Sequence, residues 1–278
     1  MRQTITSQHN PLIKYLHTLY RHDVRKREQK ILVEGLRAFI SAVEYSVPFE
    51  TALYAPERLR SDAAIAALEK AQQTGAEVVT AAPDVLDALS SRETSQGIIA
   101  VAKRPRHTLE DIEFDSESLF LVMYEPQDPS NIGAMLRSAD GAGIKTAIIV
   151  GKTPADLFDP KSIRASLGTC FSLKTVESKD TESVIQFLQR HGVSVIGSSD
   201  KAAAFIWHIH LADPIAILVG NERAGAPEEL LRMCDVTAKL PMLGAADSLN
   251  VAAAATALLY EAVRQRKSTP QHSPRVMD

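Results

Sequence analysis

Five short apolar runs after residue 118 constrain the fold of the chain more than any other feature. These runs are Leu119–Tyr124, Thr146–Val150, Val193–Gly197, Ile215–Val219 and Ala238–Met242. Most are apolar at nearly every position, which is typical of parallel strands that helices cover on both faces. Helical patterns fall between the runs, near 130–141, 160–167, 181–191 and 226–233. The sequence therefore predicts an open, Rossmann-like α/β sheet.

The first hundred residues show a second alternation of strands and helices. Strands are expected at Ile31–Gly35, Phe49–Ala55, Glu77–Thr80 and Gly97–Ala102. Helices are expected after Asn10-Pro11, at Leu36–Tyr45 and at Asp62–Thr74. This order predicts a small α/β/α domain, followed by a polar linker at 104–118. We predict domains at 1–105 and 115–267, and a flexible tail at 268–278.

The composition excludes several classes of protein. The chain has 45% hydrophobic residues and a formal net charge of -3. Cys170 and Cys234 are lone thiols without a CxxC or Cys/His cluster, so neither a zinc site nor a disulfide framework is expected. No signal-peptide core and no run of 18 apolar residues occurs. We expect a cytoplasmic protein with no membrane and no metal partner.

Positive charge gathers in one segment near the N-terminus. Between Lys14 and Arg37 there are seven Lys or Arg and three Asp or Glu, a local balance of +4. Such a patch can bind phosphate backbones through counterion release. A solvated helix face would carry the same residues, so the charge alone leaves both interpretations open.

The stretch Leu240–Arg266 joins an apolar strand, a glycine turn and an alanine-rich helix. Asp247 or Ser248 is predicted to cap the helix, because a short side chain with an oxygen accepts from the free N–H groups of the first turn. The small residues Ala252–Ala255 and Ala257 would let another backbone approach closely. A buried packing helix is the ordinary interpretation of such a run.

Three segments, in order, resemble the motifs of the SpoU (TrmH) family of RNA ribose methyltransferases, within the knotted SPOUT superfamily. Residues 131–139 (NIGAMLRSA) are similar to the first motif, 220–225 (GNERAG) to the second, and 240–266 to the third. The match covers about residues 118–267, and the N-terminal part resembles the family's RNA substrate-binding domain. Ala226 and Ala252 depart from the leucine and serine that are usual in the family.

The resemblance implies transfer of a methyl group from S-adenosyl-L-methionine to a ribose 2′-hydroxyl in RNA. It also implies a C-terminal trefoil knot and a homodimer. The two-domain layout favours ribosomal RNA over tRNA, and 23S ribosomal RNA is the expected substrate. A tRNA ribose methyltransferase and a non-catalytic RNA-binding protein on the same fold are the alternatives. A nicotinamide-dependent oxidoreductase is disfavoured, because no GxGxxG follows a predicted strand.

Polar residues of the three motifs are the candidate catalytic groups: Arg137, Glu222, Asn250, Asn131 and Ser248. Arg137 matches the family's proposed base. An arginine pKa of about 12.5 or more opposes deprotonation, so a bidentate grip on the nucleotide's phosphate is an equally physical role. Glu222 and Asn250 can orient the hydroxyl or the arginine, whereas Asn131 and Ser248 can also be ordinary helix caps.

The candidate cofactor-binding residues are Gly220, Leu240, Leu249, Leu218, Met242 and Asn250. Gly220 directly follows a predicted strand and permits close approach of a cofactor to the main chain. Leu240 and Leu249 lie before and after the glycine turn, where both can wall an adenine pocket. Leu218 and Met242 are weaker candidates, and plain core packing is the alternative for every apolar residue in this set.

Overall fold

The chain forms two compact units in a computed structural model that describes residues 4–91 and 93–268. Unit 1 comprises Met1–Arg106, Asp128–Arg137 and Ala155–Leu173. Unit 2 comprises His107–Gln127, Ser138–Pro154 and Lys174–Asp278. Two short pieces of the predicted second domain (115–267) therefore belong to unit 1. The predicted tail beyond residue 268 lies outside the described residues.

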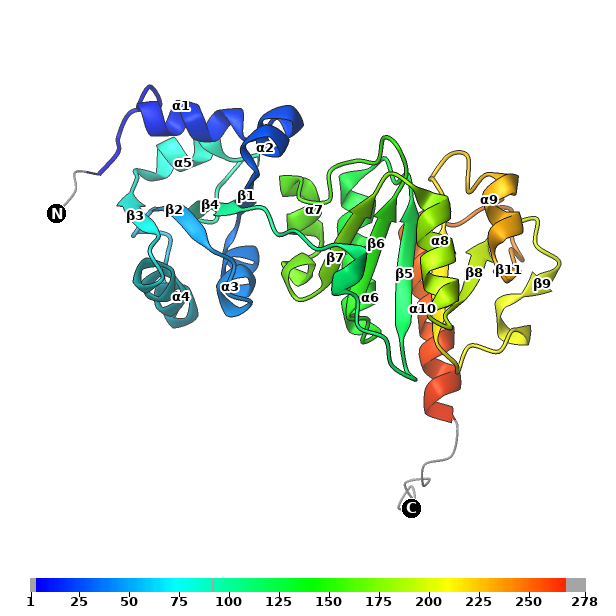
Figure 1. The fold of residues 1–278 in the computed structure, drawn as a ribbon. Helices are drawn as coiled ribbons and strands as arrows, with labels where there is room; N and C mark the ends of the chain where they lie inside the picture. Colours follow the sequence, from blue (N-terminus) through cyan, green and yellow to red (C-terminus); the bar gives the residue numbers. More distant parts are fainter. Residues whose placement is uncertain (1–3, 92, 269–278) are drawn as a thin grey trace, which may run out of the picture. The chain divides into compact units, whose positions relative to one another are not determined.

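Unit 1 is built on a four-stranded mixed sheet (Figure 1). In spatial order its strands are β1 (Lys30–Glu34), β4 (Ile98–Lys103), β2 (Phe49–Tyr54) and β3 (Glu77–Thr80). Strand β4 runs antiparallel to β1 and β2, and β3 is parallel to β2. One face carries α1 (Pro11–Thr18) and α5 (Pro83–Leu89), and the other carries α3 (Leu36–Glu44) and α4 (Asp62–Gln73). The predicted α/β/α layers are confirmed.

Local chemistry explains where these helices begin. The Asn10 side chain accepts from the Leu12 N–H, and Pro11 occupies the first turn of α1, where its missing N–H costs nothing. Ser61 caps α4 in the same way through the Ala64 N–H. The prediction missed α5, which begins at a proline without a side-chain cap. It also did not separate α2 (His22–Glu28) from the helical lead-in.

Unit 2 is built on a seven-stranded sheet in which every pair of neighbours is parallel. In spatial order its strands are β7 (Lys174–Ser178), β6 (Thr146–Val150), β5 (Leu119–Tyr124), β10 (Ile215–Val219), β8 (Ser194–Ser198), β11 (Val236–Lys239) and β9 (Ala204–Phe205). The predicted bounds of β5, β6 and β10 are confirmed. The prediction missed β7, which carries polar residues, and β9, which has only two residues.

Helices cover both faces of this sheet, as predicted. The helices of unit 2 are α8 (Thr181–Arg190), α9 (Glu228–Met233) and α10 (Val251–Ser268). Helix α7 (Pro160–Ala165) and most of α6 (Pro129–Gly141) belong to unit 1. Apolar residues of α8 join one core cluster with β5, β6 and β10. Helix α10 packs against β10 and lies behind the sheet in Figure 1, where α8 lies in front.

The structure corrects two boundaries in the third motif. The strand predicted at Ala238–Met242 ends at Lys239, before the proline at 241, which has no N–H to donate to a ladder. Neither Asp247 nor Ser248 caps α10, which begins at Val251. Asn250 is the cap: its Oδ1 accepts from the Ala252 N–H at 2.9 Å. Residues 240–250, the third-motif loop, have no helix or strand.

Candidate functional site

Three loops of unit 2 meet at the carboxyl ends of β5, β6 and β10. The chain leaves β5 for β6 and β7 on one side, whereas β10 and β8 lie on the other side of β5. The strand order therefore reverses between β5 and β10. In open parallel sheets, ligands bind outside the carboxyl ends of the strands at such a switch point.

Glu125 organises the first of these loops. It follows β5 directly with a φ of 44°, which is uncommon for a residue with a side chain. Its carboxylate Oε1 accepts from the Lys152 N–H at 2.7 Å, and its own N–H donates to the Val150 carbonyl at 2.9 Å. A Cβ on Gly151 would lie 2.2 Å from the Glu125 Cγ, so only glycine fits there. Glu125 thus joins the ends of β5 and β6.

The second motif joins the end of β10 to the same loops. Asn221 Nδ2 donates to the Glu125 carbonyl at 2.7 Å, and its Oδ1 accepts from the Arg223 N–H at 2.9 Å. Glu222 Oε2 accepts from the Gln127 N–H at 2.9 Å. Sequence reasoning selected Glu222 but missed the other members of this network, although all of them follow an apolar strand within a few residues.

Gly220 is required by the chain's own backbone. A Cβ at this position would lie 2.2 Å from the Ala226 nitrogen and 2.3 Å from the Gly225 carbonyl carbon. The close approach expected of a cofactor is therefore made here by residues 225–226. Any contact between Gly220 and a cofactor stays a prediction.

The apolar candidates differ in how much surface they offer a ligand. Leu218 is fully buried in the core cluster. Leu240 and Met242 are half-buried. Leu249 is 45% exposed, and Leu243, which the prediction did not include, is 95% exposed. The third-motif loop therefore presents apolar side chains and irregular backbone to whatever binds there.

The polar candidates divide between the two units. Asn131 and Arg137 lie on the part of α6 that belongs to unit 1, whereas Glu222, Ser248 and Asn250 belong to unit 2. Arg137 and Ser248 are exposed. Among the described residues, the Arg137 side chain makes no hydrogen bond and pairs with no carboxylate.

Asn131 is not a helix cap. Asp128 takes that position on α6: its Oδ1 accepts from the Ser130 N–H at 2.8 Å and its carbonyl accepts from the Ile132 N–H at 3.1 Å. Because Asn250 caps α10, the alternative role considered for Ser248 is also wrong. Neither Asn131 nor Ser248 is therefore explained by capping.

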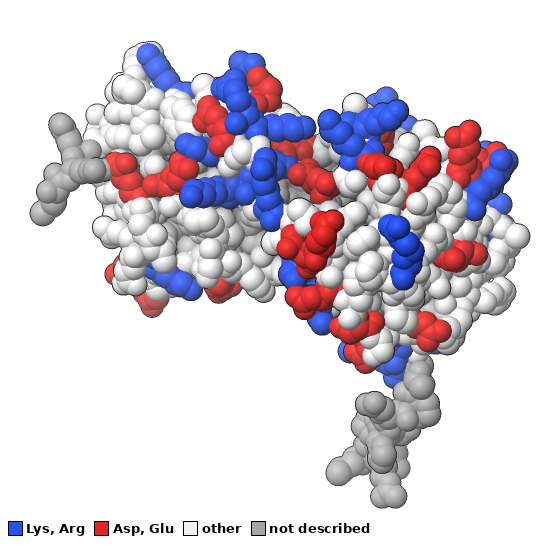
Figure 2. All heavy atoms as spheres, viewed as in Figure 1, with Lys and Arg blue, Asp and Glu red and all other residues white. Residues whose placement is uncertain are grey.

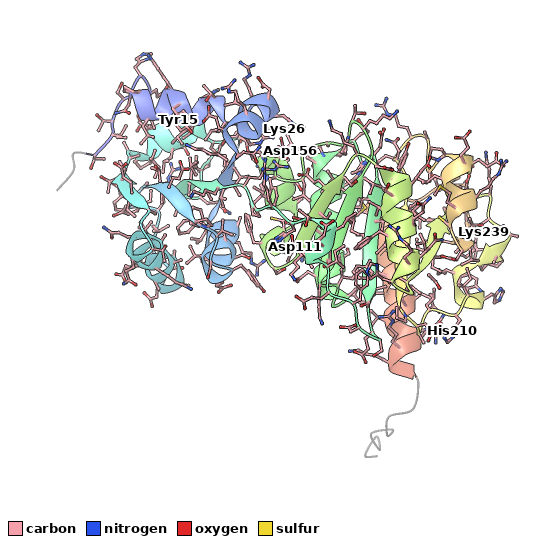
Figure 3. The ribbon with its side chains drawn as sticks, in the orientation of Figure 1. Tyr15, Lys26, Asp111, Asp156, His210 and Lys239 are labelled. Atoms are coloured by element: carbon pink, nitrogen blue, oxygen red, sulfur yellow. The ribbon has the colours of Figure 1, made fainter. Side chains whose placement is uncertain are left out.

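The basic segment of unit 1 offers fewer cations to a partner than its sequence suggests. Arg25 is fully buried, and its guanidinium donates to Asp156 at 2.7 Å and to Asp159 at 2.8 Å. Lys30 pairs with Glu50 at 2.7 Å. The cations of the segment that remain exposed are Lys14, Arg21, Lys26, Arg27 and Arg37. Figure 2 shows basic and acidic side chains intermixed over α2, and Figure 3 labels Lys26 and Asp156 there.

Thiol and metal chemistry have no support among the described residues. Burial raises the pKa of Cys170 to about 12 and that of Cys234 to about 11, so both stay protonated at neutral pH. No group of three or more His, Cys, Asp or Glu in the described ranges is arranged to hold a metal ion. Within the same ranges, no helix is both long and apolar enough to span a lipid bilayer.

Known proteins share both halves of this chain. Residues 118–260 match the SpoU rRNA Methylase family, and residues 10–100 match the MRM3-like substrate binding domain. The 23S rRNA (uridine(2479)-2'-O)-methyltransferase of Streptomyces viridochromogenes is 34% identical over 270 residues, which is 95% of this chain and 93% of that protein. The 23S rRNA (guanosine(2553)-2'-O)-methyltransferase RlmP of Bacillus subtilis is 31% identical, over 92% of this chain and 97% of that protein.

A solved structure agrees with these relatives. The SpoU methyltransferase AviRb from Streptomyces viridochromogenes, in complex with the cofactor AdoMet, superposes with a TM-score of 0.84 at 33% identity. The superposition covers 93% of this chain and 99% of that one. The family matches, the similar proteins and the parallel sheet agree with the three ordered motifs of this chain. They show that the chain belongs to the SpoU rRNA methylase family.

Proposed function

We propose that this protein transfers a methyl group from S-adenosyl-L-methionine to the 2′-hydroxyl of a ribose in 23S ribosomal RNA. The observation that carries the proposal is that a 23S rRNA 2'-O-methyltransferase matches 95% of the chain, across both the substrate-binding half and the methylase half. The two relatives act on a uridine and on a guanosine at different positions. The proposal therefore names the RNA and the hydroxyl but not the nucleotide.

The third-motif loop fits this cofactor. S-adenosyl-L-methionine has an apolar adenine, a ribose and an amino-acid end, but no phosphate that would call for a glycine-rich phosphate loop. Leu240, Met242 and Leu249 offer apolar surface for the adenine, whereas Leu218 is fully buried in the core. The irregular backbone of the loop offers N–H and carbonyl groups to its polar edges. Gly220 and Asn250 shape the two ends of this region.

The chain's own residues must fix the nucleotide, and the proton that the 2′-hydroxyl loses on methylation passes to solvent water. When bound, the cofactor supplies a methyl group made electrophilic by its sulfonium, so positioning carries much of the rate enhancement. Arg137 is exposed and without an anionic partner among the described residues, and its planar guanidinium presents donors in a fixed fork. We assign it a bidentate grip on the phosphate of the target nucleotide.

The remaining polar candidates have other assigned roles. The Glu222 carboxylate accepts a hydrogen bond from the Gln127 N–H and so fixes the loop after β5. The Asn250 side chain accepts from the Ala252 N–H in the first turn of α10 and so fixes the end of the third-motif loop. Asn131 and Ser248 are assigned to orientation of the ribose, because both are polar residues of the motifs that resemble those of the family.

The finer architecture is part of the same proposal. We infer a trefoil knot at the C-terminal part of the sheet, a cytoplasmic location, an RNA substrate-binding domain at 1–105 and a methyltransferase domain at 115–267. We also infer a homodimer through α10. Ala252 and Ala255 are buried in the chain's own core, so the exposed stripe Ala253, Ala257 and Tyr260 is the surface offered to a second copy.

Ribose-methylation mapping of 23S rRNA with and without the protein tests the function. A methylated 2′-oxygen cannot attack the neighbouring phosphate, so the modified position should resist alkaline hydrolysis. A methyl group on a base, with every ribose unchanged, would overturn the proposal.

Arg137→Ala tests the assigned grip. We expect methyl transfer to fall by about 10²–10³, as when one aligned catalytic donor is lost. Calorimetric affinity for S-adenosylhomocysteine should remain near the wild-type value. Arg190→Ala, which removes an exposed arginine from α8, is the matched control and should keep full activity. Near-normal activity in Arg137→Lys, rising with pH, would favour a base over a phosphate grip.

A further inference from the structure

An aromatic cluster lies at the outer edge of the unit 2 sheet. It comes from β9 and the short helix η3 (Ile206–His208), which follows it. The rings of Phe205 and Trp207 stack with centroids 5.0 Å apart and an interplanar angle of 15°. His208 stands edge-on to both rings, at 6.1 Å from each. The Lys239 Nζ lies 5.3 Å from the Phe205 centroid, and Figure 3 labels this lysine beside β9 and β11.

Core packing does not explain this cluster. Ile206, between the two stacked rings in sequence, is almost fully buried and anchors the turn. Trp207, the chain's single tryptophan, is 44% exposed. One side of the indole is covered by Phe205, so its exposure leaves ring surface open to solvent. Large aromatic surfaces of this kind are more typical of binding sites than of surface packing.

The charge beside the rings indicates the partner. The Lys239 ammonium makes no hydrogen bond or ion pair with any residue in the described ranges. An open indole next to an uncommitted ammonium is complementary to a nucleotide, since the base has a π-face and its phosphate is an anion. Exposed aromatics that stack unpaired bases are the common device of single-stranded RNA recognition.

We propose that Phe205, Trp207 and Lys239 form a second RNA contact, in which an unpaired base of the substrate stacks on Trp207 and Lys239 receives a neighbouring phosphate. This inference rests on the proposed function, because it needs an RNA substrate. The stacked pair is already ordered, so binding a base costs little additional side-chain entropy. Stacking is tolerant of base identity, so the contact supplies affinity for an unpaired segment and leaves the choice of nucleotide to other residues.

The test measures affinity for a 23S rRNA transcript. Trp207→Ala should bind roughly 10-fold more weakly, the usual effect of removing a base-stacking ring. Trp207→Phe, which keeps a ring, should bind nearly as tightly as the wild type. Lys239→Gln should bind about 3-fold more weakly and show a shallower salt dependence. Lys179→Gln removes an exposed lysine elsewhere in unit 2, and should leave the affinity nearly unchanged.

The single tryptophan also reports directly on the contact. Indole emission should be quenched in a saturable way by a single-stranded oligoribonucleotide of about 12 nucleotides, and much less by the same sequence as a duplex. Unchanged thermal unfolding and unchanged S-adenosylhomocysteine affinity in Trp207→Ala would separate an RNA contact from a structural role.

Two results would overturn the inference alone. One is wild-type affinity of Trp207→Ala for the transcript. The other is an indole that is quenched by rising protein concentration without RNA, which would make the cluster a protein interface. Failure of the wild-type protein itself to bind the transcript would instead overturn the proposed function.

Discussion

Two regions of the molecule depart from the usual distribution of side chains in opposite directions. The segment Ala155–Leu173 of unit 1, which contains α7, buries the charged residue Asp156 against the buried Arg25. The third-motif loop of unit 2 exposes leucines. Buried charges persist only where each has partners, so they mark contacts that must stay fixed. Exposed apolar side chains mark surface that a ligand or a second chain is expected to cover. We therefore infer that the first region is held by the chain itself, whereas the second needs a partner.

Ionic and polar contacts hold the α7 segment at both ends. At its start, Arg25 bonds to Asp156 and Asp159, and Asp159 also accepts from the Lys161 N–H at 2.9 Å to cap α7. At its end, Arg164 donates to the Ser91 hydroxyl at 2.6 Å. The Ser41 hydroxyl donates to the Gly168 carbonyl at 2.9 Å, just after the helix. All of these pairs lie within unit 1.

A chain that begins at Arg106 should show the largest effect. It would lose Arg25, Ser91 and β1, and would leave Asp156 without its guanidinium partners. Breaking one buried ion pair costs about 3–5 kcal/mol, and a whole domain has only about 5–15 kcal/mol. We expect cooperative thermal unfolding to be lost, together with binding of S-adenosylhomocysteine.

Circular dichroism of that shortened chain measures its thermal unfolding, and calorimetry measures its binding of S-adenosylhomocysteine. Retained cofactor binding with a sharp unfolding transition would show that the methylase part folds without the contacts around α7. The contrast between the two regions would then be one of composition and not of stability.

Arg25→Ala should have the next largest effect. The variant leaves the buried Asp156 and the half-buried Asp159 with one partner fewer, so the free energy of unfolding should fall by about 3–5 kcal/mol. Arg27→Ala, two residues along the same helix, removes an exposed arginine and should change the free energy of unfolding by less than about 0.5 kcal/mol. Urea unfolding of both variants provides the measurement, and equal destabilisation would contradict a special role for the buried side chain.

Sequence reasoning succeeded where a pattern is local and failed where partners are distant. Strands β5, β6 and β10 were predicted because every position of a central parallel strand is apolar or nearly so. Arg25 was counted in an RNA-binding patch because its partners lie 131 and 134 residues further along the chain. No periodicity within α2 distinguishes it from the exposed Lys26 and Arg27.

The candidate site was predictable to a similar degree. Glu222 and Asn250 could be selected from motifs, but their contacts depend on which strands become neighbours. Glu125 was missed because its function is to hold the backbone of a loop after a different strand. Its position directly after an apolar run is the one sequence feature that would have pointed to it.

Leu249→Ser tests the exposed region. If a cofactor covers this side chain, its loss should weaken S-adenosylhomocysteine binding about 3- to 10-fold. Complete burial of one leucine contributes roughly 1.5–3 kcal/mol, and a little under half of this side chain remains to be buried. The free energy of unfolding should change by less than about 0.5 kcal/mol, since the residue is already 45% exposed. Ile65→Ser, at 43% exposure in unit 1, is the matched control and should leave cofactor affinity unchanged. Equal affinities in the two variants would remove Leu249 from the cofactor site.

The smallest expected effect is the pH dependence of the buried cluster. Burial by itself raises the pKa of Asp156, but the positive charges of Arg104 and Arg25 outweigh it, so the net pKa lies below the ordinary value of 3.8. A lowered pKa in the folded state means that the ionised carboxylate stabilises the fold. That contribution is complete above pH 3.8 and is lost as the pH falls through the folded-state pKa.

Asp156→Asn should therefore be less stable than the wild type at neutral pH, and the difference in free energy of unfolding should narrow as the solution is acidified below about pH 4. Other carboxylates with lowered pKa values, such as Asp87 and Asp115, titrate in both proteins and cancel in the difference. Urea unfolding at a series of pH values measures that difference. If the difference in free energy of unfolding stays constant or grows in acid, the Asp156 charge does not stabilise the α7 segment. The contrast between this segment and the third-motif loop would then rest on packing alone.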